Sequence, residues 1–102
     1  MVNGLDIYDV LYLVKTNLTD EELVQKTDFY ENFIKKNGSS SVVKKCGIKD
    51  LSYTIKKETS ANYIQMVYIG NDNLVKLLNR EMSRDDEILR YFTTKLAEVP
   101  KM

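Results

Sequence analysis

Lysines crowd the middle of this sequence, and ammonium groups at that density are suited to contact a polyanion. Residues 32–57 carry seven lysines against one acid, Asp50, whereas residues 1–31 carry seven acids against two lysines. Although the net charge is zero, the chain therefore has an acidic first segment and a basic middle segment. A lysine-rich hairpin exposed only to water would give the same pattern, so charge alone leaves both interpretations open. The lysines assigned to the contact are Lys44, Lys45, Lys49, Lys56 and Lys57.

Residue types that carry catalysis or bind metals are scarce. There is no histidine, the commonest general base and transition-metal ligand, and the one cysteine, Cys46, therefore has no histidine to activate it. Asp85, Asp86 and Glu87 could hold a divalent cation, but adjacent acids in a turn are more often a solvated cap. No glycine-rich phosphate loop occurs. We expect no enzyme, cofactor, metal site or small-molecule substrate, and the single cysteine suits a reducing compartment.

Length and hydropathy predict one domain without a membrane span. A chain of 102 residues supports one hydrophobic core, and no apolar run approaches the length that a bilayer requires. The first residues lack the basic start and apolar region of a secretory signal. We expect an N-terminal extension at 1–6, one domain at 7–96 and a short flexible tail at 97–102.

The hydrophobic patterns predict the elements that position the lysines. Alternating and β-branched runs indicate strands at 7–15, 41–55, 62–69 and 87–95, with a polar hairpin tip at 56–60. Helical spacing indicates one helix after Thr19 and another after Asn71 or Asp72. This β-α-β-β-α-β order predicts a ferredoxin-like α+β fold, a four-stranded antiparallel sheet with two helices on one face. Such a fold hosts many functions.

Both helices show clear start and stop signals. Thr19 followed by Glu22 is a capping box, and Gly38 is the expected stop of the first helix. That helix has an apolar stripe widened by Val24 and Phe33. The stripe residues of the two helices are Leu23, Thr27, Tyr30 and Ile34, then Leu74, Leu77, Leu78 and Met82.

Two of the strands are apolar on both sides, although a sheet with helices on one face needs only one apolar side. Tyr8, Val10, Tyr12 and Val14 are expected to face the core. The alternate positions form a second apolar surface, which we interpret as covered by a partner. Scattered aliphatic and aromatic residues tolerated on an exposed sheet are the competing interpretation. The expected partner surface is Leu11, Leu13, Tyr63, Val67 and Ile69.

The third strand argues against base stacking. RNA-recognition-motif domains share this strand order and stack bases on aromatic residues of a strand that opens with a basic-Gly-aromatic sequence. The stretch at 62–69 lacks that opening and its aromatic spacing. Contacts of the lysines with the phosphate backbone are therefore expected instead.

Over about residues 7–95 the chain resembles the bacterial-type small-subunit ribosomal protein six family. Shared marks are the opening Tyr8-Asp9-Val10, a Leu-Thr-acidic helix start, and a segment parallel to the family's Gly-(hydrophobic)-Arg-Arg-Leu-Ala-Tyr-Pro-Ile-x-Lys. That segment runs from Gly47 through Leu51-Ser52-Tyr53 to Lys56. The stretches 61–66 and 86–90 also match. Lys49 and Asp50 replace the usual Arg-Arg, which puts the RNA contact at Asp50 in doubt, and Thr54 replaces the usual proline.

The resemblance implies a non-catalytic constituent of the small ribosomal subunit that binds the central domain of its RNA together with ribosomal protein eighteen. It implies a ribosome in plastid stroma or bacterial cytoplasm, and the Lys-, Asn- and Ile-rich composition fits an A+T-rich plastid or bacterial source. We also assign Arg80, Arg84 and Arg90 to RNA contact. The alternative from another class is a small ferredoxin-like regulatory or ligand-binding domain that dimerises through its sheet.

Overall fold

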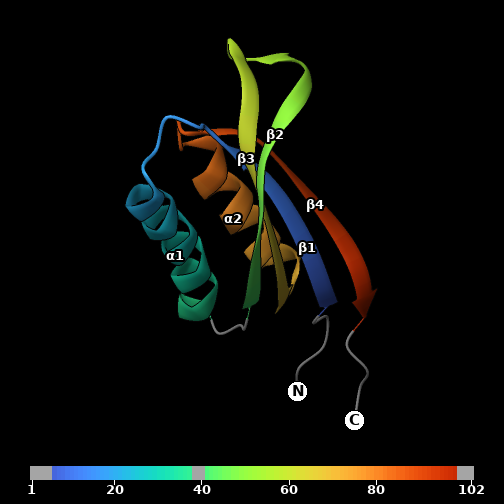
Figure 1. Cartoon of the computed structure of the whole chain (residues 1–102). Helices are drawn as coiled ribbons and strands as arrows, with labels where there is room; N and C mark the ends of the chain where they lie inside the picture. The colour runs from blue at the N-terminus through green and yellow to red at the C-terminus, as the bar shows by residue number, and fades with distance from the viewer. Residues whose placement is uncertain (1–5, 38–40, 99–102) are drawn as a thin grey trace.

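The computed structural model describes residues 6–37 and 41–98, and for residues 42–45 and 98 it describes the backbone only. In this part of the chain four strands form one antiparallel sheet in the order β2-β3-β1-β4, and two helices cover one face (Figure 1). The expected ferredoxin-like α+β fold is confirmed. The elements are β1 (Asp6–Val14), α1 (Asp20–Lys36), β2 (Ser41–Ile55), β3 (Glu58–Gly70), α2 (Asp72–Ser83) and β4 (Ile88–Glu98).

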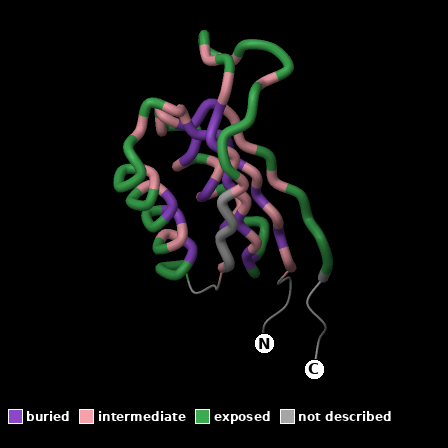
Figure 2. Tube along the Cα trace, in the orientation of Figure 1, coloured by how far each residue is buried: buried purple, intermediate pink, exposed green. Residues whose placement is uncertain are grey.

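The hydrophobic core lies between the helices and the sheet. Successive side chains of a strand point to opposite faces, and Tyr8, Val10, Tyr12 and Val14 of the central strand β1 all face the helices and are buried. Figure 2 shows this buried layer along β1 and the inner side of α1. The expected core face of β1 is confirmed. The other strands and helices contribute Tyr30, Ile34, Ile64, Met66, Tyr68, Leu74, Leu78, Met82 and Ile88.

Helix α1 begins as its capping box predicts. The Glu22 amide donates to Thr19 Oγ1 at 3.2 Å, and the Thr19 amide donates to Glu22 Oε1 at 2.9 Å. Val24 does not widen the buried stripe, because it lies about a quarter turn from the centre of that stripe and is 42% exposed. The helix ends at Lys36 and is capped by Asn37, whose amide donates to the Ile34 carbonyl; the predicted stop, Gly38, lies outside the described residues.

Helix α2 is capped by Asn71, whose Oδ1 accepts from the Leu74 amide at 2.9 Å. Leu74, Leu78 and Met82 form its buried stripe, while Leu77 is half-buried. Gly70 precedes the cap in close contact with the helix, since a Cβ there would lie 2.8 Å from Leu74 Cδ2. No helix in the described part of the chain is long and apolar enough to cross a membrane.

Strand ends differ from the sequence expectation at the hairpin tip, at the end of β4 and at the start of β1. The hairpin tip is two residues, Lys56 and Lys57, rather than 56–60, because both residues adopt positive φ angles of 48° and 69° and close a type I′-like turn. Strand β4 continues to Glu98, opposite Asp6 of β1, since pairing resumes after a register shift. Ala97 and Glu98 are therefore strand residues rather than tail, and Asp6 belongs to β1 rather than to an extension.

Candidate RNA and protein interface

The β2–β3 hairpin extends beyond the rest of the sheet (Figure 1). Strand β1 ends at Val14, opposite Asn62 of β3, whereas β2 and β3 remain paired as far as Ile55 and Glu58. The outer part of the hairpin therefore has no third strand beside it. Most side chains of this arm are exposed, although Leu51 and Ile55 pack against the sheet, and such an arm suits contact with a large partner.

Irregular pairing bends β2 on its way to the tip. The register shifts between Lys45 and Gly47, which leaves Cys46 as an extra residue, and Gly47 has a φ of 86°. Such a bulge increases the local twist and re-aims the side chains that follow. A second shift lies between Asp50 and Ile55. The segment from 51 to 55 is thereby turned toward the sheet face opposite the helices, which we call the far face.

The hairpin lysines that the structure describes are exposed. Lys49, Lys56 and Lys57 all reach solvent, and the Lys49 ammonium lies 5.3 Å from the centre of the Tyr63 ring. Lys44 and Lys45 lie in β2 in register with Gln65 and Ile64, and their side chains lie outside the described part of the structure.

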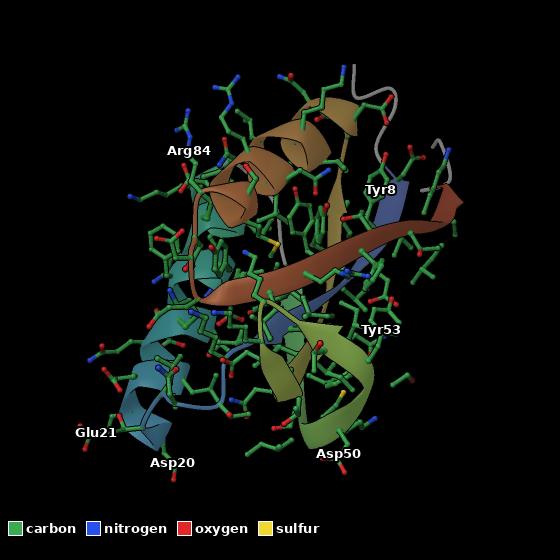
Figure 3. The ribbon with its side chains drawn as sticks, turned by 90° about the horizontal axis from the view of Figure 1, so that it is seen from above. Tyr8, Asp20, Glu21, Asp50, Tyr53 and Arg84 are labelled. Carbon is green, nitrogen blue, oxygen red and sulfur yellow. The ribbon has the colours of Figure 1, made fainter. Side chains whose placement is uncertain are left out.

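The three arginines assigned from the sequence do not lie together. Arg90 of β4 donates from Nη1 to the Tyr53 hydroxyl at 3.1 Å, and its guanidinium carbon lies 5.8 Å from the centre of the Tyr53 ring. Arg80 and Arg84, by contrast, are exposed at the end of α2. Figure 3 shows Arg84 well away from Tyr53 on the hairpin. The fold thus separates the hairpin and its neighbour Arg90 from the arginines of α2.

Leu13 does not belong to an open apolar surface. It is 3% exposed and packs with Ala61 and Leu89 in a second cluster on the far face. The bent part of β2 supplies Leu51 and Ile55, which pack against this cluster. The expectation that Leu13 projects into an uncovered patch was therefore wrong, because the chain's own hairpin covers it.

The remaining predicted surface residues are more accessible. Leu11, Tyr63 and Val67 are half-buried, and Ile69 is 38% exposed. Phe92, which lies opposite Leu11 on β4, adds a ring that is 50% exposed. The sequence argument did not include Phe92, although its alternation within β4 would have placed it on this face once the register with β1 was known.

The acidic turn after α2 is occupied by the chain's own groups. Lys26 of α1 lies 2.7 Å from Asp85 Oδ2 and 2.8 Å from Glu87 Oε1, and the Tyr30 hydroxyl donates to Asp85 Oδ2 at 2.7 Å. We call Lys26, Tyr30, Asp85 and Glu87 the α1–turn cluster. Asp85 is therefore not the expected solvated cap but a partly buried ion-pair member. Among the described residues no group of three or more Cys, Asp or Glu could hold a metal.

Ionisation in the α1–turn cluster is shifted toward the charged forms of Lys26 and Asp85. Burial opposes the charge of each residue. The hydrogen bonds of Lys26 to Asp85 and Glu87 outweigh it and raise the pKa of Lys26, and the hydrogen bonds that Asp85 accepts from Lys26, Tyr30 and the Glu87 amide lower the pKa of Asp85. Burial, with the Asp85 contact, raises the pKa of Tyr30. At the opposite end of the sheet, burial and its 3.0 Å hydrogen bond to Asp72 raise the pKa of Tyr8 to about 12.

A four-stranded antiparallel sheet with two helices on one face and a protruding lysine-bearing hairpin defines a small ferredoxin-like α+β domain. Within that class, the family model described as ribosomal protein S6 matches residues 7–95. The chain belongs to the ribosomal protein S6 family.

Individual relatives agree with this assignment. The chain is 34% identical over 93 residues to the small ribosomal subunit protein bS6c of Guillardia theta, covering 90% of this chain and 97% of the relative. It is 31% identical over 90 residues to bS6 of Trichormus variabilis, covering 87% and 83%. The crystal structure of 30S ribosomal protein S6 from Thermotoga maritima has the same fold, with a TM-score of 0.85 at 19% identity, covering 91% of this chain and 89% of that one.

Proposed function

We propose that this member of the ribosomal protein S6 family, a structural constituent of the small ribosomal subunit, binds the central domain of the subunit's RNA together with ribosomal protein eighteen. It does so without catalysing a reaction. Its place of action is the ribosome, in plastid stroma or bacterial cytoplasm, because its relatives are ribosomal proteins of plastids and bacteria. The RNA-binding domain in this proposal is the expected 7–96, extended by strand residues to Asp6 and Glu98.

One observation carries the RNA contact: exposed lysines stand on a hairpin that extends beyond the sheet. Lys56 and Lys57 form its tip, and Lys49 lies on its flank. Ammonium groups that contact phosphates release counterions from the RNA. This favours association independently of the base sequence. Lys44 and Lys45 extend the basic strand toward the base of the hairpin. Arg80 and Arg84 form a separate and weaker contact, since Glu81, Asp85 and Asp86 oppose their charge.

The tip lysines are tested by the salt dependence of RNA binding. The variant Lys56→Ala with Lys57→Ala should lower affinity for a central-domain RNA fragment and flatten the slope of log K against log salt by about 0.7–0.9 for each phosphate that is no longer neutralised. Filter binding over a series of salt concentrations measures both. The matched control is Lys35→Ala with Lys36→Ala in the last turn of α1, which should leave the slope unchanged. An unaltered slope in the tip variant would remove the hairpin from the RNA interface.

The protein contact is assigned to the far face of the sheet. Leu11, Tyr63, Val67, Ile69 and Phe92 leave apolar area there that the helices do not cover. Contiguous apolar surface on a small domain marks an interaction site. The buried Leu13 supports this surface from beneath. Self-association of the chain through the same face is the alternative function, and sedimentation of the isolated chain over a range of concentrations distinguishes the two.

A further inference from the structure

A groove lies on the far face between the bent part of β2 and strand β4. It encloses about 150 Å³. Leu11, Leu51 and Ile55 line it together with Leu13, which is buried at its base. An apolar space of about 150 Å³ accommodates one benzene-sized group. The groove therefore matches one large apolar side chain and is too small for a helix or a strand.

The aliphatic lining of the groove favours an apolar side chain over a nucleobase as the occupant. Arg90 lies over the Tyr53 ring, and Lys49 lies over the Tyr63 ring. A cation therefore covers one face of each tyrosine ring, although Tyr53 remains 63% exposed. The leucines and Ile55 offer no hydrogen bonds to a base edge. Phe92 is the third ring of the lining, and half of its area is exposed.

Charge at the groove is positive. Arg90 lines it, Lys49 lies beside it, and none of the described residues that line it is acidic. A guanidinium carries five donors, and the hydrogen bond of Arg90 to Tyr53 uses Nη1. The other donors suit a carboxylate, which an arginine binds in a forked geometry.

We propose that this groove receives one aliphatic or aromatic side chain of the protein partner, next to an acidic residue that pairs with Arg90. The proposal rests on the proposed function, because it takes ribosomal protein eighteen as the partner and specifies how that protein is held. The apolar side chain fills the space above Leu13 and contacts Phe92. The acid sets the register of the partner segment on the sheet.

Calorimetric titration of the full chain with purified ribosomal protein eighteen tests the apolar contact. Phe92→Ala should weaken binding about ten-fold, because it removes one wall of the groove. The matched control is Leu96→Ala, a side chain of the same strand with similar exposure, 54% against 50%, that does not line the groove. It should change affinity less than two-fold. Ser52→Trp, which places a ring at the groove, should weaken binding by a similar factor to Phe92→Ala.

The same titration at several salt concentrations tests the charge contact. Arg90→Gln should weaken binding and reduce its salt dependence, whereas Lys76→Gln on the exposed side of α2 should do neither. Equal affinity of Phe92→Ala, Ser52→Trp and the unaltered chain would overturn the groove proposal while leaving the partner in place. No binding by the unaltered chain would overturn the proposed partner itself. A drop in RNA affinity of Phe92→Ala with unchanged protein affinity would show the groove to be an RNA site, contradicting the proposal.

Discussion

At the scale of single residues, the α1–turn cluster joins α1 to the turn before β4. Lys26 and Asp85 are both mostly buried, with 17% and 16% of their side chains exposed. Removing one member of such a pair leaves the other desolvated without its partner. The contact joins residues that are far apart in the chain, so no local sequence pattern predicts it.

Asp85→Asn should lower the free energy of unfolding by about 1–3 kcal/mol, because Tyr30 then loses its charged acceptor and Lys26 keeps only Glu87. The matched control is Asp86→Asn, a neighbour outside the cluster, which should change it by less than about 0.5 kcal/mol. Urea denaturation at neutral pH measures both. Equal stability of the two variants would contradict the role given to Asp85.

Asp85 also predicts a pH dependence. Its pKa is lower in the folded than in the unfolded chain, where it titrates near 3.8. Its stabilising effect is therefore complete above that value and disappears as the pH falls through the folded pKa. Denaturation curves between pH 5 and about 2 should show a shallower decline for Asp85→Asn than for the unaltered chain. Parallel declines would indicate that other carboxyl groups account for the acid sensitivity.

Leu13 gives a further prediction at this scale. Leu13→Asp should destabilise the fold by at least about 3 kcal/mol, because it places a charge in a buried apolar cluster. Leu96→Asp, at an exposed position, should cost less than about 1 kcal/mol. Thermal denaturation compares them, and a stable Leu13→Asp variant would show that Leu51 and Ile55 do not cover this residue.

At the scale of elements, the hairpin places two positive charges on a turn whose backbone conformation is unfavourable for lysine. Two lysines in the left-handed region are conformationally costly, whereas Asn-Gly is the preferred pair for this turn. Backbone strain of this kind persists at functional sites. The sequence did not reveal the turn, because Lys56-Lys57 lacks the Asn-Gly signal, and a longer polar tip was the natural prediction.

Replacing the pair, Lys56→Asn with Lys57→Gly, should raise the free energy of unfolding by up to about 1 kcal/mol and lower RNA affinity. Lys56→Gln with Lys57→Gln removes the charges but keeps the strained turn, so it should lower RNA affinity without the gain in stability. Chemical denaturation and filter binding report the two effects separately. If Lys56→Asn with Lys57→Gly binds RNA with the same affinity as the unaltered chain, the tip does not contribute to RNA binding.

At the scale of the whole molecule, local signals predicted the elements and tertiary contacts decided the surfaces. The capping box at Thr19, the stripe of α2 and the alternation of β1 are local, and the structure confirms them except for Leu77, which is only half-buried. The burial of Leu13 and the pairing of Arg90 with Tyr53 depend on two register shifts in β2. No sequence period encodes such a shift, so the far face was predicted as open where the hairpin covers it.

The central claim is that the hairpin tip meets the central-domain RNA of the small subunit. The most direct measurement is RNA cleavage by iron tethered to a single cysteine, with Cys46→Ser as background, in reconstituted small subunits. Iron at Lys57→Cys should cut the central domain, while iron at Lys36→Cys, in the last turn of α1, should leave those positions intact. Cleavage of the central domain from position 36 and none from position 57 would contradict the account.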